Sequence, residues 1–430
     1  MRESLLLTLR AMVRGRVLPL LLAAVALIHW LMPGFVRSDG TSSGALEMYI
    51  RSVPGCVAVV VQLTILAVAC GLFAKEREEK RLALTLTRPV SAFSVAVGKW
   101  LALAAVSAAA LMASSLLLFL FPHGPGGDRA FPPCRHHYAP SLPPPDVCAG
   151  QMLESYLNDP ETPEAVKKAS KGAVLTLLTT KEQDRYDVVK PGESFKWPYD
   201  VKALREKMSE GVPLSLRVRF STLFDMRTPV AGELLLGGYA AVVSNNTQAL
   251  LDIPFAHAGC AMTNEAPSLV FSNTGKSTVM IRPRRDLEVL SPGDSFWWNL
   301  FRSQLETLSL SMLLAAFGIF MSASLSRPVA IFTALCSFAL VLMAPSVIVQ
   351  FPDEFHAPLA DRIGLAISRL IQTATASVSV PSPVSDLAEG RAIEWPDLMR
   401  TFVGNAVVLP ALLLAAAAFV ARRKPLSSNI

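Results

Sequence analysis

Thiol and imidazole side chains gather in one proline-rich stretch of the sequence. Cys134, His136, His137 and Cys148 lie within it, and thiolate and imidazole ligands together suit copper or zinc. Two other arrangements are open: a disulfide between Cys134 and Cys148 with Cys260 left over, or unpaired thiols. Of the three we favour the disulfide, which would close the loop, and we therefore expect no bound metal.

No catalytic motif accompanies these side chains. Gly275-Lys276-Ser277-Thr278 has the form of the end of a phosphate-binding loop, but that motif requires glycine where Val270 stands. We interpret it as a β-turn. The sequence contains neither His-Glu-x-x-His nor Gly-x-Ser-x-Gly, so a zinc or serine hydrolase has no support. We expect no catalytic residue and no cofactor in this chain.

The composition indicates which kind of secondary structure must position the thiol and imidazole groups. Charged residues make up 17% of the 430 residues and apolar residues 52%, whereas soluble domains carry about 25% charged residues. The apolar residues form six windows without charge, each long enough to cross a bilayer as a helix. The windows are Val17–Val36, Ser52–Ala74, Trp100–Pro122, Thr307–Ser326, Pro328–Pro352 and Thr401–Ala421.

The distribution of charge predicts how the helices are oriented. With both termini in the cytosol, the cytosolic segments carry an excess of Lys and Arg, and the remainder is net acidic. The net charge of +6 therefore reflects topology and gives no support to nucleic-acid binding. Residues 2–16 alternate apolar residues and arginines at helical spacing, which favours an amphipathic helix on anionic membrane lipids; a frayed basic tail is the alternative.

Two long segments lie outside the membrane in this interpretation. We expect an α-helical integral membrane protein of six transmembrane helices, with an extracytoplasmic α+β, β-sandwich-like insertion between the third and fourth. The domains are then residues 1–122, 123–296 and 297–430, the last with an external amphipathic segment at 353–400. Within the insertion the pattern predicts a Pro- and Gly-rich loop, a helix and short strands. The helix covers Val166–Gln183, and the strands are 214–220, Glu233–Val243, Ala249–Phe255, Ser268–Phe271 and Thr278–Arg282.

A short pattern occurs twice in the insertion. Pro191-Gly192 and Pro292-Gly293 are each followed by an acidic residue, serine and phenylalanine. Pro-Gly favours a type II turn, with glycine at positive φ and a strand after it. We interpret the pair as a repeated β-turn, and a duplicated binding site is the alternative.

Polar residues also fall inside or beside the apolar windows. His29, Gln62 and Asn405 are uncharged, and they can either line a pathway or form hydrogen bonds between helices. Arg302 and Glu306 are four residues apart next to two tryptophans. This spacing predicts an ion pair at the membrane interface.

A charged loop joins the second and third helices. It covers residues 75–99, and its first part is rich in good helix formers up to Pro89. A short second helix over residues 91–98 leads back to the membrane. The first helix can dock into a partner through its carboxylates, or it can be a solvated helix that only carries charge. These carboxylates belong to Glu76, Glu78 and Glu79.

Four motifs follow one another through this loop: an acidic pair, leucines at alternate positions, a Thr-x-Pro-Val-Ser turn and a final Gly-Lys. They are Glu78-Glu79, Leu82 to Leu86, Thr87-Arg88-Pro89-Val90-Ser91 and Gly98-Lys99. The loop resembles the inner loop of type-2 ATP-binding-cassette (ABC) permeases, although Ala92 replaces a usual Arg and Lys80-Arg81 a common Gly-Thr. The layout of spans also resembles the nitrous-oxide-reductase-accessory branch of that family.

The resemblance implies the membrane-spanning permease subunit of an ATP-driven ABC transporter, an exporter in a bacterial cytoplasmic (inner) membrane. Members form dimers, and two separate ABC ATPase subunits dock beneath them and bind the ATP. Coupling to the ATPase is then expected at Glu76, Glu78, Glu79, Arg81, Arg88 and Pro89. A function of another class is a membrane-anchored scaffold or binding protein whose external domain recruits a periplasmic partner. An ATPase gene beside this one would favour the transporter.

Overall fold

The contacts within the chain define two compact units in the computed structural model. Unit 1 comprises Met1–Cys134, Asp294–Val349 and Ala366–Ile430, and unit 2 comprises Arg135–Gly293 and Gln350–Leu365. Each unit is described by itself. The structure describes residues 1–35, 42–78, 91–120, 131, 134–138, 140–143, 145–160, 162, 171–199, 215–222, 230–236, 239–245, 251–254, 268–350 and 383–423.

Unit 1 is helical. The amphipathic N-terminal helix forms as predicted, and Arg16, with φ at 61°, separates it from the next helix. The helices are α1 (Arg2–Arg14), α2 (Val17–Phe35), α3 (Ser42–Glu78), α5 (Ala92–Leu120), α11 (Phe296–Ser324), α12 (Arg327–Gln350), α14 (Pro383–Ala388), α15 (Trp395–Val403) and α16 (Leu409–Arg423). A π-helical turn over Gly404–Val408 joins the last two.

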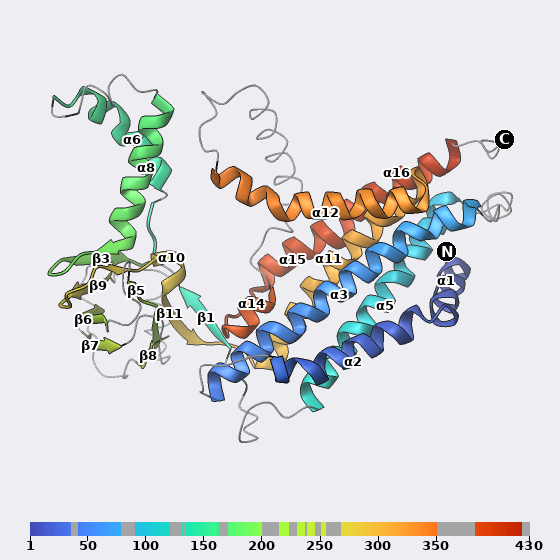
Figure 1. Cartoon of the computed structure of the whole chain (residues 1–430), viewed down its shortest axis with the longest axis horizontal. Helices are drawn as coiled ribbons and strands as arrows, with labels where there is room; N and C mark the ends of the chain where they lie inside the picture. Colours follow the sequence, from blue (N-terminus) through green and yellow to red (C-terminus); the bar gives the residue numbers. More distant parts are fainter. Residues whose placement is uncertain are drawn as a thin grey trace. The chain divides into compact units, whose positions relative to one another are not determined.

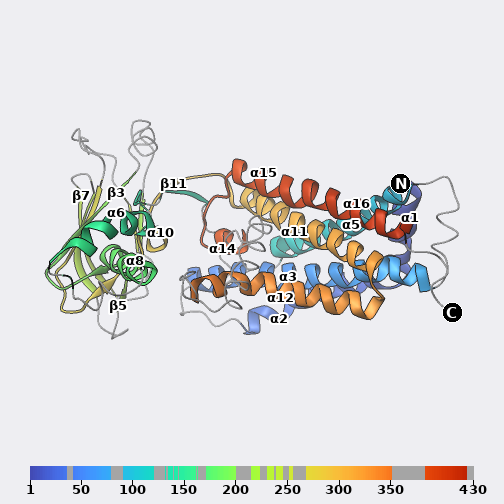
Figure 2. The same cartoon turned by 90° about the horizontal axis from the view of Figure 1, so that it is seen from above.

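The long helices run side by side in alternating directions (Figures 1 and 2). At one end of the bundle lie α1, the end of α3, the starts of α5 and α12, and the end of α16. We call it the loop end, because α3 and α5 here flank residues 79–90. The opposite end, where α11 begins and α14 lies, is the far end. The short second helix predicted over residues 91–98 is instead the first part of α5.

Four helical segments are long and apolar enough to cross a membrane: Met48–Glu76, Ala92–Leu120, Phe296–Ser324 and Trp395–Arg422. They contain four of the six predicted windows. The first window lies in a helix pair, Arg2–Arg14 and Val17–Met32, which passes the same test together but bends by 59°. The fifth overlaps α12, whose segment with described side chains, Arg327–Ala339, is apolar but has fewer than 18 residues. The described residues thus indicate an α-helical membrane protein with four or five spans.

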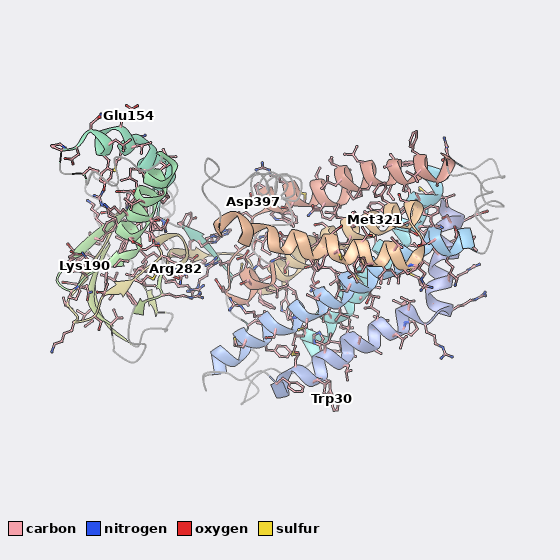
Figure 3. The ribbon with its side chains drawn as sticks, turned by 45° about the horizontal axis from the view of Figure 1, so that its top comes forward. Trp30, Glu154, Lys190, Arg282, Met321 and Asp397 are labelled. Atoms are coloured by element: carbon pink, nitrogen blue, oxygen red, sulfur yellow. The ribbon has the colours of Figure 1, made fainter. Side chains whose placement is uncertain are left out.

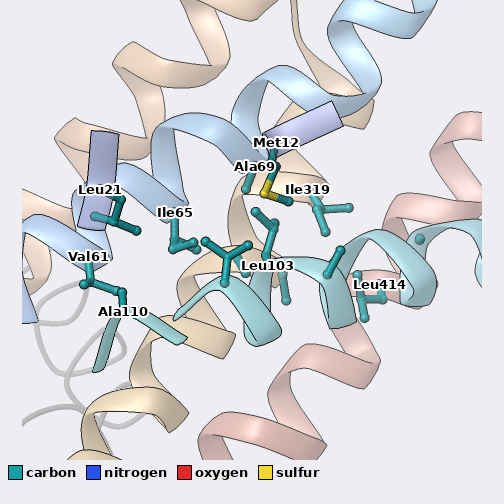
Figure 4. Packing of buried hydrophobic residues seen from close by; sticks show 14 of the residues in the cluster. Met12, Leu21, Val61, Ile65, Ala69, Leu103, Ala110, Ile319 and Leu414 are labelled. Carbon is teal, nitrogen blue, oxygen red and sulfur yellow. The ribbon is translucent and has the colours of Figure 1, made fainter. Parts of the chain in front are cut away.

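Small side chains fill much of the bundle core. Figure 4 shows Met12 of α1 in the same cluster as Ala69 of α3, Leu103 of α5 and Ile319 of α11. In lipid, burial of apolar surface contributes little to helix association. Close packing contributes instead, and alanine and glycine allow the helices to approach closely enough for it. The aromatic side chain of Trp30, labelled in Figure 3, is exposed at the far end of α2. Exposed tryptophan at a helix end is typical of the membrane interface.

The described residues of unit 2 form three antiparallel sheets and two longer helices. The sheet orders are β1-β11-β4-β8, β2-β10-β5 and β3-β9-β6-β7. The strands are β1 (Arg135–Tyr138), β2 (Val188–Val189), β3 (Ser194–Pro198), β4 (Ser215–Val218), β5 (Ser221–Thr222), β6 (Val230–Leu236), β7 (Tyr239–Asn245), β8 (Leu251–Pro254), β9 (Ser268–Asn273), β10 (Val279–Met280) and β11 (Leu287–Pro292). The helices are α6 (Pro145–Asn158), α8 (Lys171–Asp187) and the single turn α10 (Pro283–Asp286). One apolar cluster with Trp197 and Phe271 takes residues from all three sheets.

Two predictions for this insertion are corrected. The strand predicted over Glu233–Val243 is two strands, β6 and β7, whose register pairs Leu236 with Tyr239. Gly237-Gly238 lies between them in the sequence, and this dipeptide favours a two-residue hairpin turn. The predicted loop before Gly150 contains α6, which begins at Pro145, a residue tolerated in the first turn of a helix. The start of the predicted helix Val166–Gln183, up to Ser170, lies outside the described residues, as do residues 353–382 of the predicted external amphipathic segment.

The two Pro-Gly sequences adopt different structures. Gly192 has a positive φ of 77°, and β3 follows it, as a type II turn requires. After Gly293 the helix α11 begins, with Ser295 at its N-cap position. The prediction of a β-turn is therefore correct for the first copy only, and the shared sequence does not mark a duplicated site.

Candidate functional site

The loop end of the bundle holds a buried ion pair. Lys99, near the start of α5, donates to the Glu76 carboxylate near the end of α3. The Lys99 side chain is 4% exposed and that of Glu76 is 32% exposed. The ammonium also lies 4.0 Å from the centre of the Phe73 ring, one turn before Glu76. Because an ammonium group is rarely buried unless it is paired, these two contacts explain how α5 accommodates the lysine.

The N-terminal helix packs closely against the same part of α5. The Ser4 hydroxyl donates to the carbonyl of Val95 over 3.1 Å. A Cβ on Gly98 would lie 2.8 Å from the carbonyl oxygen of Met1 and 2.9 Å from the Cβ of Ser4. The Gly98-Lys99 motif therefore has a physical basis: the glycine admits α1, and the lysine binds α3.

Helix α3 is also fixed to α11 at this end. A Cβ on Gly318 would lie 2.6 Å from the Cβ of Ala69, so the two helices are at their closest approach here. One turn further along α11, the buried Ser322 hydroxyl accepts hydrogen bonds from the backbone amides of Phe73 and Ala74, each 2.9 Å long. Small residues four apart are typical of tight helix contacts in membranes.

Little of the predicted coupling loop is described. Glu76 is paired with Lys99, so its carboxylate already has a partner within the chain. Glu78 is the last residue of α3. The other residues predicted to couple to an ATPase lie outside the described residues: Glu79, Arg81, Arg88 and Pro89. For all of these residues, docking stays a prediction.

Polar groups in the middle of the bundle form hydrogen bonds between helices. The ring of His29 in α2 lies 3.2 Å from the Tyr49 hydroxyl of α3 and 3.0 Å from the Ser114 hydroxyl of α5, through its two nitrogens. His29 is completely buried. Of the two interpretations for this histidine, helix-to-helix bonding fits the geometry. Asn405 is buried in the π-helical turn, and Gln62 is also buried.

A second polar cluster lies at the far end, around the start of α11. The Asn299 amide donates to the carbonyl of Arg391 at 2.7 Å and accepts from the amide of Ile393 at 2.9 Å. Arg302 donates to the Ile393 carbonyl at 3.0 Å and forms an ion pair with Asp294. The ion pair predicted between Arg302 and Glu306 is therefore wrong: the guanidinium lies toward the N-terminal end of α11, where Asp294 precedes the helix.

The same cluster fastens α14 to α3. Arg51 of α3 donates to Glu389 at 2.7 Å and to the Ser385 hydroxyl at 3.1 Å. Arg391 contacts the other Glu389 oxygen at 3.0 Å and Asp386 at 3.8 Å. Burial raises the pKa of Asp386 to about 6; the Arg391 guanidinium opposes this rise, and the charge of Glu389 adds to it.

Asp386→Asn should change how stability depends on pH. Because the pKa of Asp386 is raised in the folded chain, the folded state binds the proton more tightly than the unfolded state between about pH 4 and pH 6. The free energy of unfolding should therefore fall as the pH rises through this window. We expect the thermal-unfolding midpoint of the variant, minus that of the wild type, to increase from pH 4 to pH 7. A constant difference across this range would contradict the assignment.

The pairing of the cysteines stays a prediction. Cys134 and Cys148 are both free thiols in the structure, and they belong to different units. Burial raises the pKa of Cys134 to about 11, which keeps it protonated. The Cys148 sulfur lies 3.7 Å from the Tyr186 hydroxyl. Within the described part of the chain, no three His, Cys, Asp or Glu side chains converge as they would around a metal ion. Cys260 lies outside that part.

The phosphate-loop-like sequence forms a bend between β9 and β10. Its Gly275 amide donates to the Asn273 side chain at 3.0 Å. Asn273 in turn donates to the carbonyls of Ser277 at 2.9 Å and Val189 at 3.0 Å. The backbone amides and the side chain of Asn273 thus hold a turn, in agreement with the interpretation from the sequence.

The loop end also coincides with a sequence match. Residues 12–129 match the family described as ABC-2 family transporter protein. This ABC-2 match covers less than half of the chain, and no curated protein or solved structure matches the chain significantly. It supports a multi-pass membrane protein with the role of an ABC-2-type permease. Proteins of the ABC-2 family are typically non-catalytic membrane subunits, and in general they imply an ABC ATPase as partner.

The ABC-2 segment contains the Glu76–Lys99 pair and the His29 cluster; it includes Gly98 as well, although the α1 residues that Gly98 contacts, Met1 and Ser4, precede it. The far-end cluster around Asn299 and Glu389 lies beyond it. Sequence reasoning missed Lys99, Asn299 and Glu389 as bonded groups. A signal existed for Lys99, because a lysine next to an apolar window must find a counter-ion or reach water. No such signal existed for Asn299 and Glu389, because their partners lie far away in the sequence.

Proposed function

We propose that this chain is the membrane-spanning permease subunit of an ATP-driven ABC transporter, acting as an exporter with a separate ATPase subunit. The observation that carries the proposal is the ABC-2 match over residues 12–129, which includes both helices that flank the loop. The loop resemblance to the nitrous-oxide-reductase-accessory branch adds to it. In this proposal the permease forms a homodimer, and the ATPase subunits bind the ATP.

The ATPase would dock on residues 79–90 and the end of α3, at Glu78, Glu79, Arg81, Arg88 and Pro89. Two features of the described residues support this location. The loop lies between two helices that are rigidly packed against α1 and α11. The end of α3 carries several charges, which suit a polar groove. Since the Glu76 carboxylate pairs with Lys99, we assign docking chiefly to the acidic pair that follows it.

Reversing both charges of that pair tests the proposal. Glu78→Lys with Glu79→Lys should reduce co-purification of the ABC ATPase encoded nearest to this gene by tenfold or more. Like charges facing a basic groove cost several kcal/mol, and about 1.4 kcal/mol corresponds to a factor of ten in affinity. Glu3→Lys, at an exposed acidic position of α1 outside the loop, is the matched control and should bind normally. Failure of the wild type to recover the ATPase would favour the scaffold function instead.

We further propose six spans, with both termini and the loop end in the cytosol of a bacterium and unit 2 in the periplasm. Basic side chains dominate the loop end, as the positive-inside rule expects of a cytosolic face. The described ones are Arg2, Arg10, Arg14, Arg16, Lys75, Lys99, Arg327 and Arg422. In this topology, unit 2 would receive the substrate or hold a periplasmic partner.

Labelling with an impermeant maleimide tests the topology. Lys190→Cys places a thiol on an exposed turn of unit 2, next to Gly192 (Figure 3). It should react in intact spheroplasts above the wild-type background. Arg14→Cys, in the exposed last turn of α1, should react only after the inner membrane is broken. The reverse pattern would invert the topology.

A further inference from the structure

The two helix ends that flank the loop are joined to each other by one ion pair. Glu76 lies three residues before Glu79, where the described part of α3 has ended, and Lys99 lies in the third turn of α5. The pair links positions 23 residues apart in the sequence. The ends of α3 and α5 are therefore connected directly, in addition to the connection through residues 79–90.

Both contacts that stabilise the ammonium come from one helix. Glu76 supplies the carboxylate and Phe73, one turn earlier, supplies the ring face. The lysine side chain is almost inaccessible, whereas the carboxylate is partly exposed. Removal of the carboxylate would thus leave a cation without water and without a counter-ion, which strongly disfavours the present arrangement.

Each partner is also anchored on its other side. Ser322 of α11 accepts hydrogen bonds from the amides of Phe73 and Ala74, so the last turns of α3 cannot move without α11. On α5, Ser4 of α1 binds the Val95 carbonyl one turn before Lys99. The ion pair is thus one polar link between an α3–α11 pair and an α1–α5 pair; the indole of Trp100, the next residue of α5, provides another by donating to the Met312 carbonyl of α11 at 2.8 Å.

We propose that Glu76 and Lys99 are positioning residues for the loop: their ion pair makes α3 and α5 move together when the loop is displaced. The inference rests on the proposed function, because the displacement would come from the docked ATPase. It assigns Glu76 a role within the chain, and it separates this residue from Glu78 and Glu79, to which the proposed function assigns docking. Loss of the pair should leave ATPase binding intact. It should weaken the conformational change that the permease undergoes when the bound ATPase binds nucleotide.

The test combines a double-mutant cycle with hydrogen exchange. The full chain is purified in lipid nanodiscs as wild type, Glu76→Gln, Lys99→Met and the double variant, and amide exchange is measured over residues 70–78 and 92–99. Lys99→Met keeps an apolar chain of similar length, so this variant should fold even if Glu76→Gln does not. We expect each single variant to exchange at least tenfold faster in both segments, and the double variant no faster than the worse single one. Lys75→Met, which removes an exposed charge next to the pair, is the control and should match the wild type.

The second part measures the response to nucleotide. The same proteins are bound to the ATPase, and exchange at the far end, residues 296–303 and 383–395, is compared with and without a non-hydrolysable ATP analogue. We expect the analogue to change exchange there in the wild type and in Lys75→Met, and not in the pair variants, while all of them retain the ATPase within twofold. Wild-type exchange in both single variants, or effects that multiply in the double variant, would overturn the proposal. If the wild type binds no ATPase, the proposed function fails, and the exchange cycle still decides whether the pair joins the two helices.

Discussion

Gly318→Ala is expected to lower the thermal stability of the purified chain more than any conservative change at the surface. The new methyl group would lie 2.6 Å from the Cβ of Ala69 and close to the α3 backbone, so α3 and α11 must separate. Overpacking of this kind costs about 1–3 kcal/mol, and loosening the contact would also weaken the Ser322 hydrogen bonds. The midpoint of thermal unfolding in detergent is the measurement, and Gly318→Val should lower it further.

Two controls separate crowding from helix propensity. Gly34→Ala also places a methyl group on a helical glycine, but nothing lies within 4 Å of that position, so it should be neutral or slightly stabilising. Ala69→Gly combined with Gly318→Ala removes the nearest clashing atom and should recover part of the loss. A Gly318→Ala chain as stable as the wild type would show that the helices are not in close contact.

Asn299→Ala is expected to release the backbone of residues 391–393 from the far end. The Asn299 side chain is 1% exposed and binds both the Arg391 carbonyl and the Ile393 amide. Its loss removes both hydrogen bonds, and a buried polar group that loses its bond costs about 1–3 kcal/mol. Cleavage by trypsin after Arg391 should therefore become at least tenfold faster.

Arg51→Met provides the comparison for this prediction. The Arg51 side chain is 42% exposed, so its ion pair with Glu389 should contribute less than the buried amide contacts. We expect at most a threefold increase in cleavage after Arg391. Equal rates for Asn299→Ala and the wild type would mean that other contacts hold the segment.

The sequence predicted the helical spans well because the signal is local. A stretch without charge, long enough for a bilayer, needs no knowledge of its neighbours, and four windows coincide with long apolar helices. The ion pairs are different. Spacing of four residues predicted Arg302 with Glu306, yet the guanidinium binds Asp294, which precedes the helix. Glu76 belongs to a charge run that suggests docking, and its partner Lys99 lies beyond the loop.

The strands of unit 2 show the same difference between features with a local sequence signal and features that depend on distant partners. Alternation predicted β4 and β9 close to their observed bounds, because each has one buried face. A single long strand was predicted where β6 and β7 pair, since the apolar residues continue on both sides of Gly237-Gly238. The second Pro-Gly precedes a helix because the residues after it are the aromatic start of α11. The hairpin had a local signal in Gly237-Gly238, which the continuous apolar pattern concealed. The second Pro-Gly had none, because its structure depends on the packing of the helix after it.

The Arg51–Glu389 contact implies an order of events during biosynthesis. The two residues are 338 positions apart, so at about 5–20 residues per second the ribosome needs roughly 15–70 s to supply the partner of Arg51. Until then α3 and α11 must be inserted with the polar face of Asn299 unsatisfied. The segment from Pro383 to Ile393 is thus the last part of the far-end cluster to be made. A stalled or truncated chain would lack it and would present unbonded polar groups that membrane quality-control proteases can recognise.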